Sequence, residues 1–143
     1  MFESLFQKYP FFRAVPCILC MAVIFKLSSL TDMDLKEFPH IWDKLAHCLE
    51  YASLAGCYAM VWTRGEWSRR QWLRILVVAA LCVAYGCTDE YHQSFVEGRD
   101  CSALDLVADL CGGLLGGTVY AAIVKLLNRF DPIKSDNNST TSS

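Results

Sequence analysis

The sequence predicts an all-α fold, an integral membrane bundle of four transmembrane helices. Hydrophobic residues make up 54% of the 143 residues, and the mean hydropathy of +0.27 is high for a soluble protein of this size. These residues gather into four blocks of about 20 residues, the length that crosses ~30 Å of hydrocarbon. We assign residues 1–130 to a single membrane domain. Residues 131–143 are polar, rich in Ser, Asn and Thr, and predicted to be a disordered tail.

The first apolar run extends from Phe11 to Ser29. Arg13 near its start, and the lack of a small-residue cleavage motif near its end, predict an uncleaved anchor rather than a signal peptide. Pro16 falls in the first turns, where proline costs least. Lys26 is expected either to snorkel to the membrane interface or to balance the acidic residues described below.

The second helix is predicted from about Asp43 to Trp62, and a basic connection from Thr63 to Gln71 follows it. Tryptophan is enriched where a helix meets the membrane surface. Three tryptophans are therefore expected to mark the interface at this connection: Trp62, Trp67 and Trp72.

The third helix is predicted from Trp72 to Gln93, followed by a short loop with Gly98. Ser102 is a good N-cap for the fourth helix, and Asp105 lies at the N3 position of a capping box. That helix is expected to continue to about Leu127.

Arginine and lysine near the helix ends predict the orientation. They concentrate beside both termini and in the connection between the second and third helices, which should therefore be cytoplasmic. The loops Leu30–Ile41 and Ser94–Cys101 should then face outward. The net charge of −2 shows no basic excess for nucleic acid, so the lipid bilayer is the expected partner.

Polar residues gather at the outward ends of the last three helices. At 3.6 residues per turn, the polar residues of the second and fourth helices each form one stripe. In the third helix Asp89 and Gln93 share a stripe, His92 flanks it and Glu90 points about a quarter turn away. The candidate acid–base or ligand-binding cluster consists of Asp43, His47, Glu50, Asp89, Glu90 and His92. Further candidate ligand-binding residues are Lys44, Gln93, Arg99, Asp105 and Asp109.

Carboxylates outnumber cations at this place, because only Lys44 and Arg99 oppose the acids named above. Protons, protonated histidines or a metal ion must compensate in a desolvated pocket. Asp43 and Asp105 lie in first turns, where a carboxylate also serves as a cap, so both roles stay open. Asp89 and Glu90 lie near a helix C-terminus, where the dipole disfavours acids, so capping does not explain them.

A divalent metal is one interpretation of the cluster. His47 with Glu50, and Asp89 with His92, each offer two ligands one turn apart, similar to carboxylate sites in helical bundles. The candidate metal ligands are therefore His47, Glu50, Asp89 and His92. We favour acid–base chemistry without a metal, or a hydrogen-bonded site for a polar head group.

The chain has eight cysteines, six of them inside apolar runs, where they act as small hydrophobic residues. Cys48 and Cys101 lie near the polar residues, and whether they pair is left open.

Several segments together resemble the VanZ-like family of small bacterial membrane proteins. They are Asp43–Tyr51, Asp89–Phe95, Gly98–Asp105 and Gly112, with Ile24–Ser29 similar to the end of that family's first helix. The resemblance covers about Ile24 to Gly117 and implies a multi-pass protein of the bacterial cytoplasmic (inner) membrane. The family's namesake is associated with resistance to teicoplanin, a glycopeptide antibiotic that acts on outer cell-wall precursors. Asp109 departs from the family pattern, which more often has Asn there.

The leading functional hypothesis is a cell-envelope protein that binds or modifies an extracytoplasmic polar ligand, such as a lipid-linked wall component or one related to glycopeptides. Arg99 would contact an anionic group, and the acid–base cluster would act on the ligand. One alternative is proton- or cation-coupled transport. Another is a non-catalytic accessory subunit, which packs against a partner helix through Gly112 and Gly116. Whether the protein is an enzyme stays open.

Overall fold

The computed structural model describes residues 10–30, 40–99 and 101–130. The side chains described are those of residues 11–30, 44–99 and 101–130. The predicted tail and residues 31–39 of the loop predicted to face outward lie outside this part. Within it the fold is all-α and contains no strand, as predicted. The elements are η1 (Pro10–Ala14), α2 (Val15–Ser28), α4 (His40–Ala59), α5 (Arg64–Arg69), α6 (Gln71–Gln93) and α7 (Ala103–Phe130).

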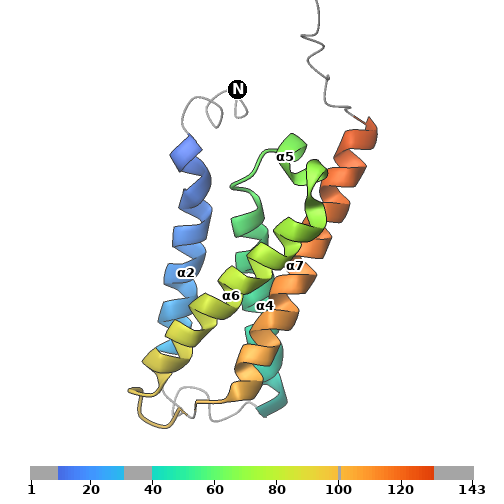
Figure 1. The fold of residues 1–143 in the computed structure, drawn as a ribbon. Coiled ribbons are helices and arrows are strands. Elements are labelled where there is room, and N and C mark those ends of the chain that lie inside the picture. Colours follow the sequence, from blue (N-terminus) through green and yellow to red (C-terminus); the bar gives the residue numbers. More distant parts are fainter. Residues whose placement is uncertain (1–9, 31–39, 100, 131–143) are drawn as a thin grey trace, which may run out of the picture.

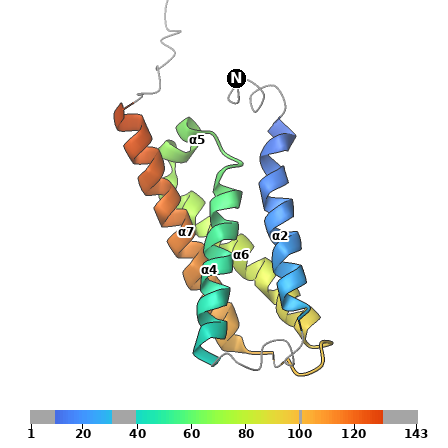
Figure 2. The ribbon, with the colours of Figure 1, turned by 180° about the vertical axis from the view of Figure 1, so that it is seen from behind.

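Helix α7 is the element against which most of the chain packs. It lies along both α4 and α6, while α2 leans on α4 and α6 from the other side (Figures 1 and 2). The start of α2, the short helix α5 and the end of α7 lie at the same end of the bundle, which we call the α5 end. The connection between α6 and α7 lies at the opposite end, which we call the loop end.

Two pairs of adjacent glycines allow α7 to approach two helices at once. A Cβ at Gly112 would meet the Cys48 carbonyl oxygen of α4 and lie 3.0 Å from the Ala52 nitrogen. A Cβ at Gly113 would lie 2.9 Å from the Ala79 Cα of α6. Adjacent residues on a helix point about 100° apart, so one glycine of each pair faces α4 and the other faces α6. The stripe predicted to meet a partner helix, Gly112 and Gly116, is covered by α4 of the same chain.

Among the described residues, three helical stretches are long and apolar enough to cross a membrane: Phe11–Ser28, Gln71–Gln93 and Ala103–Phe130. Helix α4, predicted to be the fourth span, is not among them. It carries Asp43, Lys44 and Glu50 within its 20 residues, and each charge is costly in hydrocarbon. The chain is thus a multi-pass membrane protein, and in the described part α4 is a long helix that carries much of the polar site.

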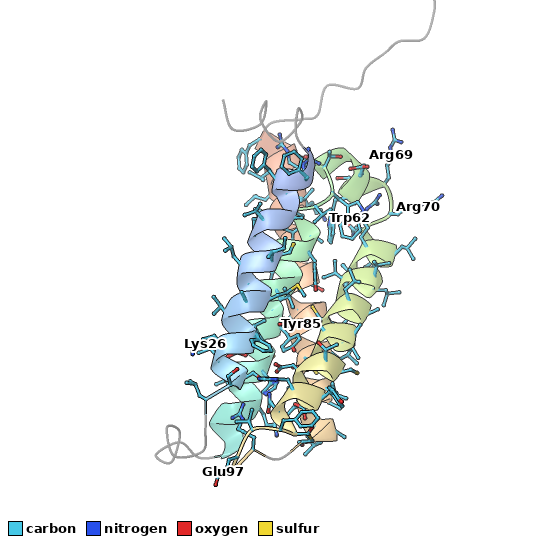
Figure 3. All side chains as sticks on the ribbon, turned by 90° about the vertical axis from the view of Figure 1, so that its left-hand side faces the viewer. Lys26, Trp62, Arg69, Arg70, Tyr85 and Glu97 are labelled. Atoms are coloured by element: carbon cyan, nitrogen blue, oxygen red, sulfur yellow. The ribbon has the colours of Figure 1, made fainter. Side chains whose placement is uncertain are left out.

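Large apolar side chains cover the outside of the bundle. On α2, Ile18 and Leu19 are 63% and 62% exposed, and on α6 Trp72 is 72% exposed. Such a surface would favour aggregation in water but suits contact with lipid. Lys26 is exposed on α2 and points away from the other helices (Figure 3), which fits the snorkelling alternative for this residue.

The basic connection contains a helix that the sequence analysis did not predict. The Thr63 hydroxyl accepts a hydrogen bond from the Glu66 N–H at 3.2 Å, and the Thr63 N–H donates to the Glu66 carboxylate at 2.8 Å. This capping box starts α5, whose Trp67 is fully buried with its ring 4.9 Å from that of Tyr120. Trp67 therefore packs in the core rather than facing lipid, and its position at the membrane interface stays a prediction.

Candidate functional site

A layer of buried polar side chains occupies the loop end of the bundle. It is built from the first half of α4, the last turns of α6 and the first turns of α7, which meet at this end (Figure 1). Among the described side chains of these three helices, six buried polar residues form the layer: His47, Asp89, Glu90, Gln93, Asp105 and Asp109. All six belong to the predicted site, so the structure brings the core of that set together.

Asp109 fixes the orientation of His47. The His47 Nδ1 and the Asp109 Oδ1 are 3.0 Å apart, and these residues are 4% and 0% exposed. An ionised carboxylate only accepts hydrogen bonds, so this contact holds a proton on Nδ1. The lone pair of the neutral ring then lies on Nε2. The backbone of Gly86 leaves the space in which the Asp109 carboxyl group sits.

Asp105 pairs with Lys44 of α4. Asp105 is buried, whereas the Lys44 side chain remains 33% exposed. The predicted N-cap of α7 is confirmed, because the Ser102 hydroxyl accepts from the Leu104 N–H at 3.2 Å. The predicted capping box is wrong in its other half, since the Ser102 N–H donates to Glu90 rather than to Asp105.

Glu90 joins the end of α6 to the start of α7. Its Oε2 accepts the Ser102 N–H at 2.8 Å, and its backbone oxygen accepts the Cys101 thiol at 3.0 Å. The carboxylate therefore lies at the N-terminus of α7, where the dipole favours negative charge. The expectation that capping does not explain Glu90 is thus wrong, because Glu90 accepts a hydrogen bond at the start of the next helix. Cys48 and Cys101 are both free thiols.

Asp89 and His92 point to different neighbours. The Asp89 Oδ2 accepts from the Gln93 amide at 3.0 Å, one turn along α6. The His92 Nε2 lies 3.0 Å from the Ser29 hydroxyl, and its ring packs 4.3 Å from that of Phe25. His92 thus contributes to the contact between α2 and α6.

The remaining predicted residues lie around this layer. Glu50 is half-buried, and the charges close enough to influence it include those of His47, Asp89 and Arg99. Arg99 is half-buried in the connection between α6 and α7. Asp43 belongs to α4, but its side chain lies outside the described side chains.

One group of three residues lies close enough together to hold a metal ion. His47, Glu90 and Asp105 each offer a ligand atom, and these atoms lie within 4.8 Å of one another. The sequence analysis grouped His47 with Glu50, Asp89 and His92, so only His47 is common to the two sets. The three residues come from three helices, and no spacing within one helix could indicate this group.

Two tyrosines that the predicted set omitted lie on the core side of the layer. The Tyr51 ring is parallel to that of His47 at 6.2 Å, and Tyr51 is fully buried. The Tyr85 hydroxyl donates to the Met21 carbonyl oxygen at 2.7 Å and lies between α2 and α6 (Figure 3). Their positions one turn from His47 and Asp89 are the sequence signal that would have identified them.

Comparison with known proteins identifies a family. No curated protein sequence and no solved structure matches the chain. A family model described as VanZ/LLP1 matches residues 6–125, which include the whole polar layer. This match confirms the resemblance to VanZ-like proteins. Since it spans most of the sequence, the chain belongs to the VanZ/LLP1 family.

Proposed function

We propose that this protein binds or modifies a polar ligand at the outer surface of the bacterial cytoplasmic membrane, namely the head group of a lipid-linked cell-wall component. The observation that carries the proposal is a set of buried carboxylate oxygens. Among the described residues, Asp89 Oδ1, Glu90 Oε1 and Asp109 Oδ2 have no hydrogen-bond partner. Each such atom costs about 1–3 kcal/mol unless something supplies a donor or a cation.

The chemistry of the layer suits a sugar–phosphate head group. Sugar hydroxyls and amide N–H groups are donors for the carboxylate oxygens of Asp89 and Glu90. Arg99 at the same end offers a planar guanidinium, which binds phosphate through two hydrogen bonds. The exposed apolar faces of α2 and α6 would accommodate the lipid chain beside the site.

The basic residues support the outward placement of the layer. Arg69 and Arg70 lie at the α5 end and Glu97 at the loop end (Figure 3). Cytoplasmic ends of membrane helices are enriched in Arg and Lys, so the α5 end and both termini would lie inside. Towards the α5 end the core is apolar, with Leu54, Ala59 and Val78 fully buried, which supports ligand binding over a continuous transport path.

The proposal is tested by ligand binding to the full chain in lipid nanodiscs. A polyprenyl-diphosphate-linked wall precursor should raise the melting temperature, whereas a polyprenol of equal chain length should not. Asp89→Asn keeps an acceptor for Gln93 but removes charge, and Arg99→Lys keeps charge but removes the planar fork. Both variants should fold, and their affinity for the wall precursor should fall at least tenfold.

Glu97→Gln is the matched control, since Glu97 is an exposed acid at the same end. It should bind like the wild type. In a teicoplanin-sensitive bacterium, wild type and Glu97→Gln should raise the inhibitory concentration of teicoplanin, and Asp89→Asn and Arg99→Lys should not. Unchanged binding and resistance in both site variants would show that the layer is structural.

A further inference from the structure

We propose that His47, Glu90 and Asp105 bind one divalent transition-metal ion of the zinc or manganese class. The inference rests on the same site as the proposed function and names its cofactor. Each of the three residues is more than nine-tenths buried. Their ligand atoms lie within 4.8 Å of one another and come from α4, α6 and α7.

The first supporting observation is the orientation of the histidine. Metal-binding histidines usually donate their other ring N–H to a carboxylate, which fixes the tautomer and strengthens the ligand. The Asp109 carboxylate is such a partner for His47, because the Nδ1 and Oδ1 atoms are 3.0 Å apart and both residues are buried. His47 would therefore ligate through Nε2, and Asp109 is a positioning residue.

The second observation is the carboxylate of Glu90. Its Oε2 is held by the Ser102 N–H at 2.8 Å, so the group is fixed in place. Its Oε1 is buried and has no hydrogen-bond partner in the part of the chain that the structure describes. A buried carboxylate oxygen in this state is unfavourable, and coordination to a cation would satisfy it.

The charge balance favours a cation at this place. Four buried acids meet in the layer, namely Asp89, Glu90, Asp105 and Asp109. Lys44 pairs with Asp105, yet its side chain is one-third exposed. The positive charge of Lys44 lies beside Asp105 and would compete there with a bound cation. Removing this lysine should strengthen metal binding.

The ligand set indicates the class of metal. One imidazole nitrogen with two carboxylates suits zinc, manganese or iron(II), whereas magnesium and calcium prefer all-oxygen sites. Three protein ligands leave coordination positions open, as in catalytic sites. A phosphate or hydroxyl oxygen of the ligand could occupy such a position and be polarised by the ion.

The test uses the purified full chain in nanodiscs, titrated with Zn²⁺ alone and with Mn²⁺ alone. We expect one saturable ion per chain. Electron-spin-echo spectroscopy of the Mn²⁺ form should show coupling to an imidazole nitrogen. This coupling should disappear in His47→Gln.

Single variants should separate ligands from neighbours. Glu90→Gln and Asp105→Asn should weaken binding at least tenfold, and Asp109→Ala by about 10–100-fold because it releases the histidine. Lys44→Gln should strengthen binding about fivefold, as expected for removing a partly exposed competing ion pair. Asp89→Asn removes a buried charge outside the group of three and should weaken binding less than Glu90→Gln does. Glu97→Gln, which changes an exposed acid at the same end, is the control and should leave the affinity for the metal unchanged.

Three outcomes would overturn the inference, and the first does not depend on the folding of any variant. They are a wild type without a saturable site, a His47→Gln protein that keeps its affinity and nitrogen coupling, and an Asp89→Asn protein weakened as much as Glu90→Gln. The last would indicate diffuse attraction to an acidic pocket. Wall-precursor binding without metal binding would leave the proposed function standing, and metal binding without precursor binding would leave only the metal site.

Discussion

The position of the Asp109 carboxyl group depends on Gly86, because glycine has no side chain to occupy the same space. Gly86 of α6 faces Asp109 of α7, and a Cβ there would collide with Asp109 Oδ2 and lie 3.1 Å from its Cγ. Asp109 is short and already bonded to His47, so it cannot move aside without breaking that contact. A residue with no polar group thus controls the orientation of the histidine.

We therefore expect Gly86→Ala to damage the site more than the fold. Overpacking should cost about 1–3 kcal/mol of stability, and metal and precursor binding should fall at least tenfold. Gly56→Ala is the control, because a Cβ at Gly56 meets nothing within 4 Å. It should leave binding unchanged and stabilise the helix by ~0.5–1 kcal/mol. Melting temperatures and Mn²⁺ titrations of the two variants measure both effects. If the two variants had equal stability and equal affinity for Mn²⁺, Gly86 would not control the position of Asp109.

At the scale of the helices, α7 holds the bundle together through closely packed backbones. Gly112 and Gly116 lie against backbone atoms of α4, which cannot move as a side-chain tip can. Gly113 lies against the Ala79 backbone of α6. Gly117 is different, since a Cβ there would make ordinary contacts of 3.4–3.6 Å with Ile75.

Alanine at these four positions should have unequal effects. Gly112→Ala, Gly113→Ala and Gly116→Ala should each destabilise the bundle by about 1–3 kcal/mol, because two helices must separate. Gly117→Ala should be close to neutral. The fraction of monodisperse protein after detergent extraction, followed against temperature, ranks the four variants. If Gly117→Ala were as unstable as Gly116→Ala, the space for a Cβ between Gly117 and Ile75 of α6 would be contradicted.

At the scale of the whole molecule, the two ends of the bundle differ in charge. Arg69 and Arg70 lie exposed at the α5 end, and Glu97 lies exposed at the loop end. If the α5 end is cytoplasmic, the polar layer is next to the outer surface, where wall precursors are presented.

Single cysteines in a cysteine-free background should report this orientation in intact cells. Arg69→Cys should resist a membrane-impermeant thiol reagent until the membrane is permeabilised, whereas Glu97→Cys should react at once. Both sites are exposed, so a difference reflects the side of the membrane rather than burial. The opposite labelling pattern would place the layer in the cytoplasm and remove the wall precursor as its ligand.

The sequence by itself determined the long helices, the membrane character and the end of the bundle at which the polar residues gather. Apolar runs fix where helices lie, because an unpaired backbone is not tolerated in lipid. The buried layer was also predictable, because ionisable residues near hydrocarbon must meet one another or solvent, and His47, Asp89 and Asp105 do gather at one end. The family could be recognised from the same segments.

Only the tertiary structure decided which polar group meets which. Helical periodicity gives the face on which a residue lies but not the neighbour that the face meets. The contacts that define the site join residues 61 or 62 positions apart, as in Lys44 with Asp105 and His47 with Asp109. The same reason explains why Glu90 is stabilised by the next helix and why Trp67 of α5 is buried against Tyr120 of α7. Helix α4 combines charge and burial because α6 and α7 cover its polar face, which no property of its own sequence could indicate.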